Sequence, residues 1–256
     1  MPNNFLRGFW KVSWVETKVF MREPMGFIGT IAMPAIIFVV MGRAFGATRP
    51  AGALAGVTAI SPPRFNVAIL AAIVIAVGAV QSLVAIIAIY REGGILKRLR
   101  ATPLSPVTIL GAHVAVKLGF TVVSLALVVL AGRRLFPGVM QVNVFSFSAA
   151  VLLSTLSILS LGFVLASLVP TARFAQPIGA VVMYPMVALS GLFFPLSQLP
   201  RALQAVAYAL PTTHAVALLQ GVWDGSGWSA HWMNVGALGL IFVVFSALST
   251  RVFRWE

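Results

Sequence analysis

The sequence predicts an all-α, polytopic membrane protein with six transmembrane helices. Of its 256 residues, 60% are hydrophobic and only 9% are charged, whereas a soluble globular domain carries about 25% charged residues. The mean hydropathy is +1.00, and apolar runs of about 20 residues, each long enough to cross a bilayer as a helix, recur along the chain. We therefore treat residues 1–256 as one transmembrane domain with spans at about 26–45, 66–90, 106–131, 144–169, 173–194 and 231–249.

Residues 1–24 are predicted to form an amphipathic helix that lies at the membrane interface without crossing it. At about 100° per residue, the cationic side chains fall within one narrow arc and the apolar ones on another side. The cations are Arg7, Lys11, Lys18 and Arg22, and the apolar residues are Phe5, Phe9, Val12 and Val19. Pro24 ends this helix, and Pro34 is expected to kink the first span.

Polar side chains inside the next spans are few. Gln81 and Ser82 interrupt the second span, and His113 and Lys117 lie near the predicted cytoplasmic end of the third. We expect Lys117 to snorkel to the headgroups and His113 to be a helix-end polar residue. A role of Lys117 in binding a substrate or a proton is the alternative.

The third and fourth spans carry clear local signals. Ser105 is a suitable N-cap for the third span, with Pro106 in its first turn. The fourth span is rich in small residues at spacings that allow close helix contacts in lipid. We interpret these residues as packing positions, with a serine-lined path as the alternative; they are Ser148, Ser154, Thr155, Ser157, Ser160, Gly162, Ala166 and Ser167.

Residues 195–228 differ from the rest of the chain. The segments 199–210 and 213–222 are apolar enough for helices but too short to cross a bilayer, and prolines at 195, 200 and 211 punctuate them. Such segments enter the membrane and return, or lie upon its face. We expect extracellular re-entrant helices here, with a packed extracellular cap as the alternative.

The distribution of basic residues predicts the orientation. With the N-terminus inside, eleven Lys and Arg residues are cytoplasmic and six are external, so both termini are expected in the cytoplasm. The net charge of +13 is then explained by anionic headgroups. No nucleic-acid partner is needed.

The sequence predicts no catalytic residue, no metal site and no cofactor in this chain. It has no cysteine, and no Gly-Lys dipeptide that a phosphate-binding loop requires. All five acidic residues flank spans, so no carboxylate pair is visible. His214, His231 and Asp224 are metal-ligand types without ligand spacing. A membrane-embedded enzyme would need convergent ionisable groups within the spans, and Lys117 is the one group that we count as available for this.

The segment from Tyr90 to Pro106 is the one strongly charged block between two spans. Ile95, Leu96 and Leu99 share one helical face while the basic side chains lie away from it, which indicates a short amphipathic helix ended by prolines. One interpretation is a basic loop that only orients the protein. The other is a lever that a soluble partner contacts.

Two motifs carry a resemblance to a known family. The run Glu92-Gly93-Gly94-Ile95-Leu96-Lys97-Arg98-Leu99-Arg100-Ala101-Thr102-Pro103-Leu104-Ser105 resembles the signature between the second and third spans of ABC-2 type permeases. The run Leu189-Ser190-Gly191-Leu192-Phe193-Phe194-Pro195-Leu196, with Leu210-Pro211-Thr212-Thr213-His214-Ala215, is similar to the late motif of the same family. The resemblance covers essentially the whole chain and is closest to the daunorubicin-type multidrug exporter branch. Arg91 departs from the acidic residue that many members carry before Glu92.

The resemblance implies half of a transporter in the plasma membrane of a prokaryote. Two permease copies, expected as a homodimer, would associate with two cytoplasmic ABC ATPase subunits that bind ATP and Mg. Residues 91–104 would be the coupling helix, contacting the ATPase through Arg91, Glu92, Gly94, Leu96, Lys97, Arg98, Leu99, Arg100, Pro103 and Leu104. The first and fifth spans would meet across the dimer, with Gly42, Gly46 and Gly179 as close-contact positions.

The cargo implied by that branch is a lipophilic, drug-like or lipid-like compound, as in multidrug efflux and antibiotic resistance. Soft and aromatic residues of the fifth span are the candidate path: Met183, Tyr184, Met186 and Phe193. A polysaccharide or lipid-linked glycan is the alternative cargo, but few tryptophans or tyrosines sit in mid-span to stack on sugars. A membrane anchor or assembly factor without transport activity is the alternative from another class.

Overall fold

The computed structural model describes residues 2–22, 27–46, 67–94, 106–135, 143–169, 171–193 and 195–252. These residues form helices and connecting turns with no strand among them, which confirms the predicted all-α class for this part of the chain. The elements are α1 (Pro2–Arg22), η1 (Ile28–Ala32), α3 (Met33–Gly46), α4 (Val67–Glu92), α6 (Pro106–Leu135), α7 (Val144–Leu168), α8 (Ala172–Ala188), η2 (Leu196–Gln198), α9 (Arg201–Tyr208), α10 (Pro211–Trp223), α11 (Gly227–Ala230) and α12 (Trp232–Val252).

Four of these helices are long and apolar enough to cross a membrane. They comprise Ile69–Glu92, Gly111–Leu135, Val144–Leu168 and Trp232–Ser249. The α9 and α10 helices together pass the same test but are bent by 80°, which is the geometry of a broken span or a re-entrant pair. The described part of the chain is therefore a multi-pass membrane protein with four to five candidate spans.

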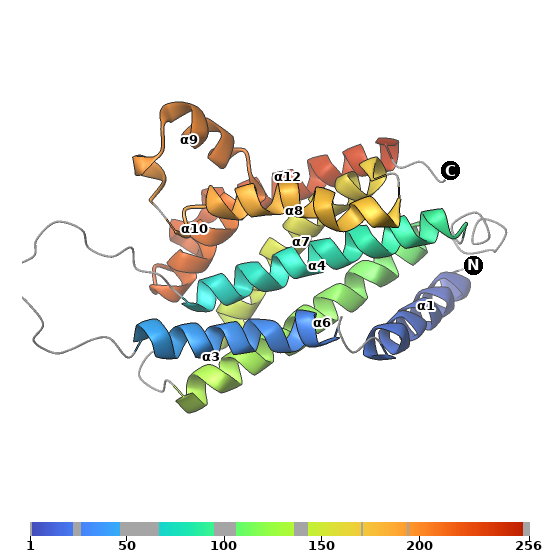
Figure 1. Cartoon of the computed structure of the whole chain (residues 1–256), viewed down its shortest axis with the longest axis horizontal. Helices are drawn as coiled ribbons and strands as arrows, with labels where there is room; N and C mark the ends of the chain where they lie inside the picture. The colour runs from blue at the N-terminus through green and yellow to red at the C-terminus, as the bar shows by residue number, and fades with distance from the viewer. Residues whose placement is uncertain are drawn as a thin grey trace, which may run out of the picture.

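The α4 helix lies in the middle of the bundle (Figure 1). It contacts η1, α3, α6, α7, α8 and α10. Fully buried residues lie on all sides of it, among them Ile69, Ala71, Ile75 and Ala88. A helix that is apolar all round suits this central position, because it has no face to present to water.

The small residues of α7 serve helix packing, as predicted. Ser154, Thr155, Ser157 and Ser160 are buried, and the hydroxyl of Ser157 donates to the carbonyl of Leu238 on α12 over 2.9 Å. On the other side, a methyl group added at Gly162 would lie 3.1 Å from Val80 of α4. The missing side chain therefore lets α7 approach the central helix closely.

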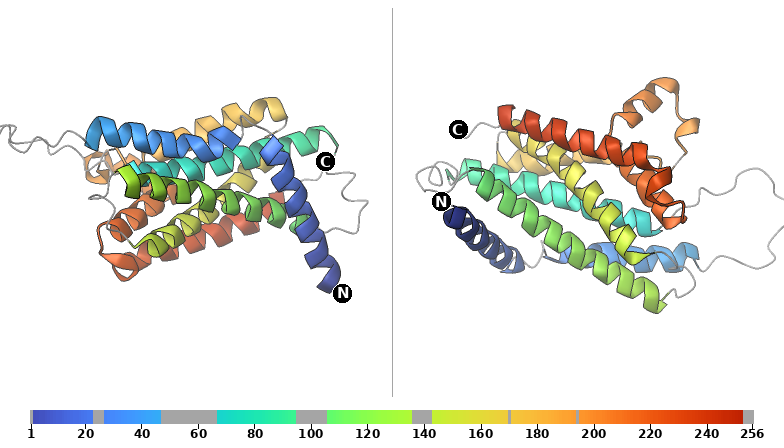
Figure 2. Two further views of the ribbon diagram at one scale, coloured as in Figure 1. Left: turned by 90° about the horizontal axis from the view of Figure 1, so that it is seen from below. Right: turned by 180° about the vertical axis from the view of Figure 1, so that it is seen from behind.

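The α1 helix runs obliquely across the bundle, beside α6 and at the end of the bundle where α12 also ends (Figures 1 and 2). Its exposed side carries Trp10 and Trp14, whereas Phe20 is buried, with its ring centroid 4.2 Å from that of Phe120 on α6. This two-sided character agrees with the amphipathic pattern of the sequence. The helix ends at Arg22.

The first apolar segment opens with a π-helical turn instead of a regular α-helix. In η1 the N–H of Met33 donates to the carbonyl of Ile28, five residues earlier. Pro34 follows directly and has no N–H to continue an α-helical ladder, so an irregularity at this point has a local cause. The turn places Gly29 and Thr30 at the wall of a cavity discussed below.

The fifth predicted span and the region after it differ from the expected bounds. The α8 helix ends at Ala188 instead of continuing to residue 194, because a turn follows in which Gly191 takes φ +84°, a left-handed conformation that glycine adopts without strain. Beyond it, α10 is largely buried in the bundle, whereas α9 is mostly exposed. Short helices are thus present where the sequence predicts them.

Candidate functional site

The last three residues of α4 each bind a different neighbouring element. The hydroxyl of Tyr90 donates to Glu16 on α1 over 2.5 Å, and a guanidinium N–H of Arg91 donates to the carbonyl of Val169, directly after α7, over 2.9 Å. The carboxylate of Glu92 accepts from the N–H of Ala172, the first residue of α8, over 2.8 Å. Successive helical residues point about 100° apart, so three consecutive side chains can reach in three directions. We call Tyr90, Arg91 and Glu92 the α4 cluster.

Glu92 caps a helix that does not cap itself. The N-cap residue of α8, Thr171, makes no side-chain capping hydrogen bond. The first N–H groups of a helix have no partner within it, and the N-terminus carries a partial positive charge that favours an anion. The carboxylate from α4 accepts a hydrogen bond from one of these N–H groups and places a negative charge at the N-terminus. Such a cap stabilises a helix by about 1 kcal/mol. The start of α8 is therefore fixed to the end of α4.

A glycine ends α4 immediately after the cluster. The N–H of Gly93 donates to the carbonyl of Ile89, and the N–H of Gly94 donates to that of Arg91. Gly94 takes φ +65°, which stops the helix without the strain that a side chain would cause. The predicted coupling helix, residues 91–104, therefore starts within the last two residues of α4. Seven of its predicted contact residues lie outside the described residues: Leu96, Lys97, Arg98, Leu99, Arg100, Pro103 and Leu104.

Glu16 of α1 joins the α4 cluster to α6. Besides Tyr90, its carboxylate contacts Nδ1 of His113 at 3.3 Å, and the Tyr90 and His113 rings meet edge to face at 5.4 Å. Burial opposes ionisation of this carboxyl group. The hydrogen bond and charge of His113, the hydrogen bond of Tyr90 and the charge of Lys117 outweigh burial, and the pKa of Glu16 is lowered. Glu16 is thus a charged link between α1, α4 and α6.

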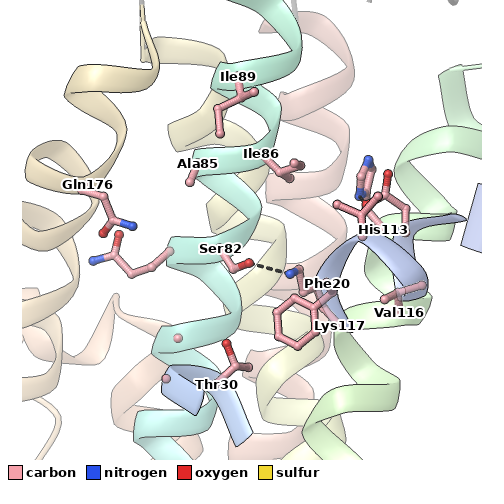
Figure 3. Close-up of a pocket in the computed structure, with 15 residues that line it drawn as sticks. Phe20, Thr30, Ser82, Ala85, Ile86, Ile89, His113, Val116, Lys117 and Gln176 are labelled. Carbon is pink, nitrogen blue, oxygen red and sulfur yellow. Dashed lines mark hydrogen bonds and ion pairs between the residues drawn. The ribbon is translucent and has the colours of Figure 1, made fainter. Parts of the chain in front are cut away.

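A cavity of about 360 Å³ lies beside this link, lined by α1, η1, α4, α6 and α8 (Figure 3). Lys117 reaches into it from α6, where Nζ donates to the hydroxyl of Ser82 on α4 over 2.5 Å and lies 4.6 Å from the centre of the Phe20 ring. Gln81 and Gln176 contribute amide groups to the same wall. The lining combines polar and apolar groups, which suits an amphipathic occupant.

The snorkelling expected of Lys117 is wrong. Lys117 is only 8% exposed and His113 only 2%, because α1 covers the face of α6 that carries them. Sequence reasoning treated each residue as a helix-end polar group. Their spacing of four residues places both on one helical face and was the available signal for a shared site. Nothing in the sequence indicated that Glu16 would meet them.

The remaining predicted residues are placed as follows. Met183 and Met186 are buried in the core, Tyr184 is 67% exposed on α8, and Phe193 is partly buried beyond the end of that helix. Gly179 faces α4 of the same chain, since a methyl group there would lie 2.0 Å from the Oε1 atom of Gln81. Gly42 and Gly46 belong to the last turns of α3. The path and dimer roles of these residues stay predictions.

No group of three His, Asp or Glu side chains that could hold a metal ion occurs among the residues that the structure describes. The features on which the site rests are hydrogen bonds between helices, a polar cavity and a charged helix end. Together they describe a multi-pass helical membrane protein whose central helix is bonded at one end to an amphipathic N-terminal helix.

Comparison with known proteins supplies the family. The model of the ABC-2 type transporter family matches residues 7–223, and the chain belongs to this family. Nodulation protein J of Rhizobium leguminosarum bv. viciae is 33% identical over 99 residues, which are 39% of this chain and 38% of that protein. The protein of the same name from Rhizobium meliloti is 33% identical over 102 residues, which are 40% of this chain and 39% of that protein. The one from Bradyrhizobium diazoefficiens is 37% identical over 95 residues, which are 37% of this chain and 36% of that protein.

The family match settles the coarse nature of the chain. The ABC-2 membrane domain is the permease component of a transporter and has no ATPase activity of its own, as the missing phosphate-binding loop predicts. Each match to a nodulation protein J spans less than two fifths of that relative's length. These matches show a distant relationship to nodulation protein J. They do not identify the branch of the ABC-2 family or the transported compound.

Proposed function

We propose that this chain is the permease subunit of an ABC exporter that moves a lipophilic, drug-like or lipid-like compound out of a prokaryotic cell. Two copies associate with two cytoplasmic ABC ATPase subunits, which bind ATP and Mg. Six spans, formed by η1 with α3, α4, α6, α7, α8 and α12, cross the plasma membrane. Both termini face the cytoplasm, in agreement with the count of basic residues.

The observation that carries this proposal is the α4 cluster. The predicted coupling helix, residues 91–104, overlaps the last two residues of α4, and the cluster joins this end of α4 to α1, α7 and α8. A displacement of residues 91–104 by the closing ATPase is therefore passed directly to the N-terminus of α8 through Glu92. Rigid elements joined by hydrogen bonds transmit such a movement, whereas a flexible loop would absorb it.

The exposed side of α8 and the polar cavity favour an amphipathic cargo. Tyr184 and Val181 are exposed on α8, and Gln176 of the same helix borders the cavity. A compound with a polar head and an apolar body can use both surfaces. A lipid-linked glycan has the same two parts, so it is retained as the alternative cargo. Transport of a labelled lipophilic drug and of a labelled glycolipid into the same inverted vesicles separates the two.

Charge reversal in the coupling helix tests the proposal. We expect Lys97→Glu with Arg98→Glu to lower ATP-driven export at least about tenfold and to loosen binding of the ATPase subunit, because like charges then face the contact. The matched control is Arg133→Glu with Arg134→Glu, an adjacent pair of cations at the far end of α6 that should leave ATPase binding unchanged. Full export and full binding by the coupling-helix variant would reject the lever. ATPase activity that does not respond to the permease would favour a membrane anchor.

The orientation has its own test, helped by the absence of native cysteine. Single cysteines introduced as Leu99→Cys and Pro200→Cys should react with a membrane-impermeant maleimide from opposite sides of the membrane. Labelling of both from one side would overturn the proposed topology.

A further inference from the structure

The cavity lined by α1, η1, α4, α6 and α8 contains a hydrogen-bond donor that the chain itself does not use. The hydroxyl of Ser82 accepts from Nζ of Lys117 over 2.5 Å, so its own hydrogen must be directed elsewhere (Figure 3). No acceptor among the described residues takes this hydrogen. Serines on helices commonly donate to a carbonyl of the preceding turn, as Ser160 and Ser167 do on α7. Ser82 is therefore a spare donor in the wall of the cavity.

The neighbouring residue of α4 is also incompletely bonded. The amide of Gln81 lines the cavity, and its Oε1 atom is buried without a hydrogen-bond partner among the described residues. Exchanging the oxygen and nitrogen of the amide would place an unpaired donor at the same position. Buried polar groups of native proteins nearly always have a partner. Gln81 and Ser82 together therefore indicate that something outside this chain completes the wall.

The space beside these groups is open. Gly78 of α4 and Gly29 of η1 line the cavity, and a methyl group added at either would contact no neighbouring part of the described chain within 4 Å. The cavity volume of about 360 Å³ lies within the range of ligand pockets, about 300–1,000 Å³. Val19 of α1 and Ile89 of α4 also line it, and both are apolar and about half exposed. The cavity can therefore hold a polar head and the start of an apolar tail.

The charges of the wall favour an acidic head over a basic one. Lys117 brings a cation into the cavity from α6. The carboxylate among the described lining residues, Glu16, is already engaged, since it accepts from Tyr90 and contacts Nδ1 of His113. A cationic head would meet Lys117 and find no carboxylate without partners. An anionic head gains the positive charge of Lys117 and the hydrogen of Ser82, and hydrogen bonds to an ionised acceptor are the stronger ones.

We propose that this cavity is a binding site for an amphiphile with a carboxylate or phosphate head. The head accepts hydrogen bonds from Lys117 and Ser82, and the apolar tail leaves the cavity past Val19 and Ile89. Two sources share this chemistry: a single-chain acid, as a lipid-like cargo would be, and an acidic phospholipid of the bilayer. The inference concerns binding by the permease alone. It therefore stands or falls separately from export and from the ATPase subunit.

Photolabelling of the full-length permease tests the site. The probe is palmitic acid with a diazirine in mid-chain, added to permease in phosphatidylcholine nanodiscs without ATPase subunit or nucleotide. We expect saturable labelling of α1 and α4 around Val19 and Ile89, located by peptide mass spectrometry. Dodecyl phosphate should compete, whereas dodecanol and dodecyl trimethylammonium should compete at least about tenfold less well. Labelling that does not saturate, or that dodecanol displaces as well as dodecyl phosphate does, would overturn the proposal.

Substitutions of the donor pair separate charge from shape. Lys117→Met removes the charge with little change in length and should lower labelling about tenfold, whereas Lys117→Arg should retain most of it. Ser82→Ala removes only the hydroxyl and should lower labelling less. Lys11→Met removes an exposed cation of α1 outside the cavity lining and is the matched control, with labelling unchanged. Equal labelling of Lys117→Met and the unaltered chain would reject the site.

Gly78→Leu tests the space without altering the polar groups. The new side chain extends into the cavity, and leucine favours a helix over glycine. Labelling should be lost while the thermal unfolding temperature does not fall, so misfolding is excluded as the cause. Gly119→Leu is the control, because an added methyl group on this exposed glycine of α6 also meets nothing within 4 Å and the residue does not line the cavity. Undiminished labelling of folded Gly78→Leu would place the ligand elsewhere and overturn the inference.

The composition of the nanodisc distinguishes the two sources. Replacing part of the phosphatidylcholine by phosphatidylglycerol should lower labelling several-fold if the bilayer supplies the ligand, and phosphatidylglycerol should then co-purify with the unaltered chain more than with Lys117→Met. Labelling that phosphatidylglycerol leaves unchanged but dodecyl phosphate displaces would assign the site to a single-chain acid. Failure of both phosphates to displace the probe would show that the cavity does not recognise an anionic head, and would overturn the proposal.

Discussion

The two ends of the bundle are joined by different kinds of hydrogen bond. In the α4 cluster, Tyr90, Arg91 and Glu92 bind a carboxylate, a carbonyl and a helix N-terminus, and every donor already carries its hydrogen. At the other end, contacts between His214, Asn234, His231 and Ser226 run in series from the carbonyl of Tyr208 to that of Gly221. The first arrangement therefore ties the end of one helix to three neighbours at once, whereas the second ties its groups one after another.

This difference suits the two ends to different tasks. A rigid junction next to the predicted coupling helix can pass a push to several helices at once. The serial contacts connect the end of α9 to α12 through His214 of α10. Variants of the α4 cluster should therefore change transport.

The largest effect is expected when Glu92 no longer caps α8. Glu92→Ala removes the bond through which the coupling helix would move α8, and we expect ATP-driven export in vesicles to fall about tenfold, within the range of measured coupling energies. Binding of the ATPase subunit should persist, which separates this variant from charge reversal at Lys97 and Arg98. Glu92→Gln keeps an oxygen acceptor and is the matched control, with most of the export retained. Normal export by Glu92→Ala would show that α8 does not depend on this link.

A smaller effect is expected at the contact between α4 and α1. Tyr90→Phe removes the hydrogen bond to the Glu16 carboxylate, a charge-assisted bond worth about 1.5 kcal/mol, which corresponds to roughly a tenfold change in the opening equilibrium of α1. Hydrogen exchange of the α1 amides measures this opening. Tyr208→Phe, whose ring is exposed at the other end of the molecule, is the control. If both variants exchange alike, Tyr90 does not hold α1.

The sequence predicted the helices well because their signals are local. The Pro106 start of α6 and the Val144 start of α7 follow from a proline and from Asn143, whose side chain accepts from the N–H groups of Phe145 and Ser146. The end of α8 was placed too late, because the residues after Ala188 remain apolar although Gly191 turns the chain. Hydropathy reports what a segment can tolerate and does not fix where its helix ends.

The candidate site could be predicted only in part, because its contacts join residues far apart in the chain. Arg91, Glu92 and Gly94 were predicted as coupling-helix contacts from the resemblance to the family. Their bonding partners Val169 and Ala172 are backbone groups, which leave no mark in the sequence. The position of α1 across α6 decides that Lys117 is enclosed instead of reaching the headgroups, and no periodicity within either helix encodes that crossing.

The smallest effect is expected from acidification at Glu16, and its sign follows from the lowered pKa of this carboxyl group. A carboxyl group whose pKa is lower in the folded state contributes stability that is fully present above its unfolded pKa, about 4.3, and is lost as the pH falls through the folded value. The α1 helix should therefore stay docked from pH 7 to about pH 5 and loosen only below about pH 4. A fluorophore on Lys11→Cys, in this cysteine-free chain, reports docking. Glu16→Gln should bind α1 less firmly at neutral pH and respond little to acid. If α1 undocks with a midpoint above pH 5 in the protein that keeps Glu16, the lowered pKa would be contradicted. Burial of the carboxyl group would then outweigh the effects of His113, Tyr90 and Lys117.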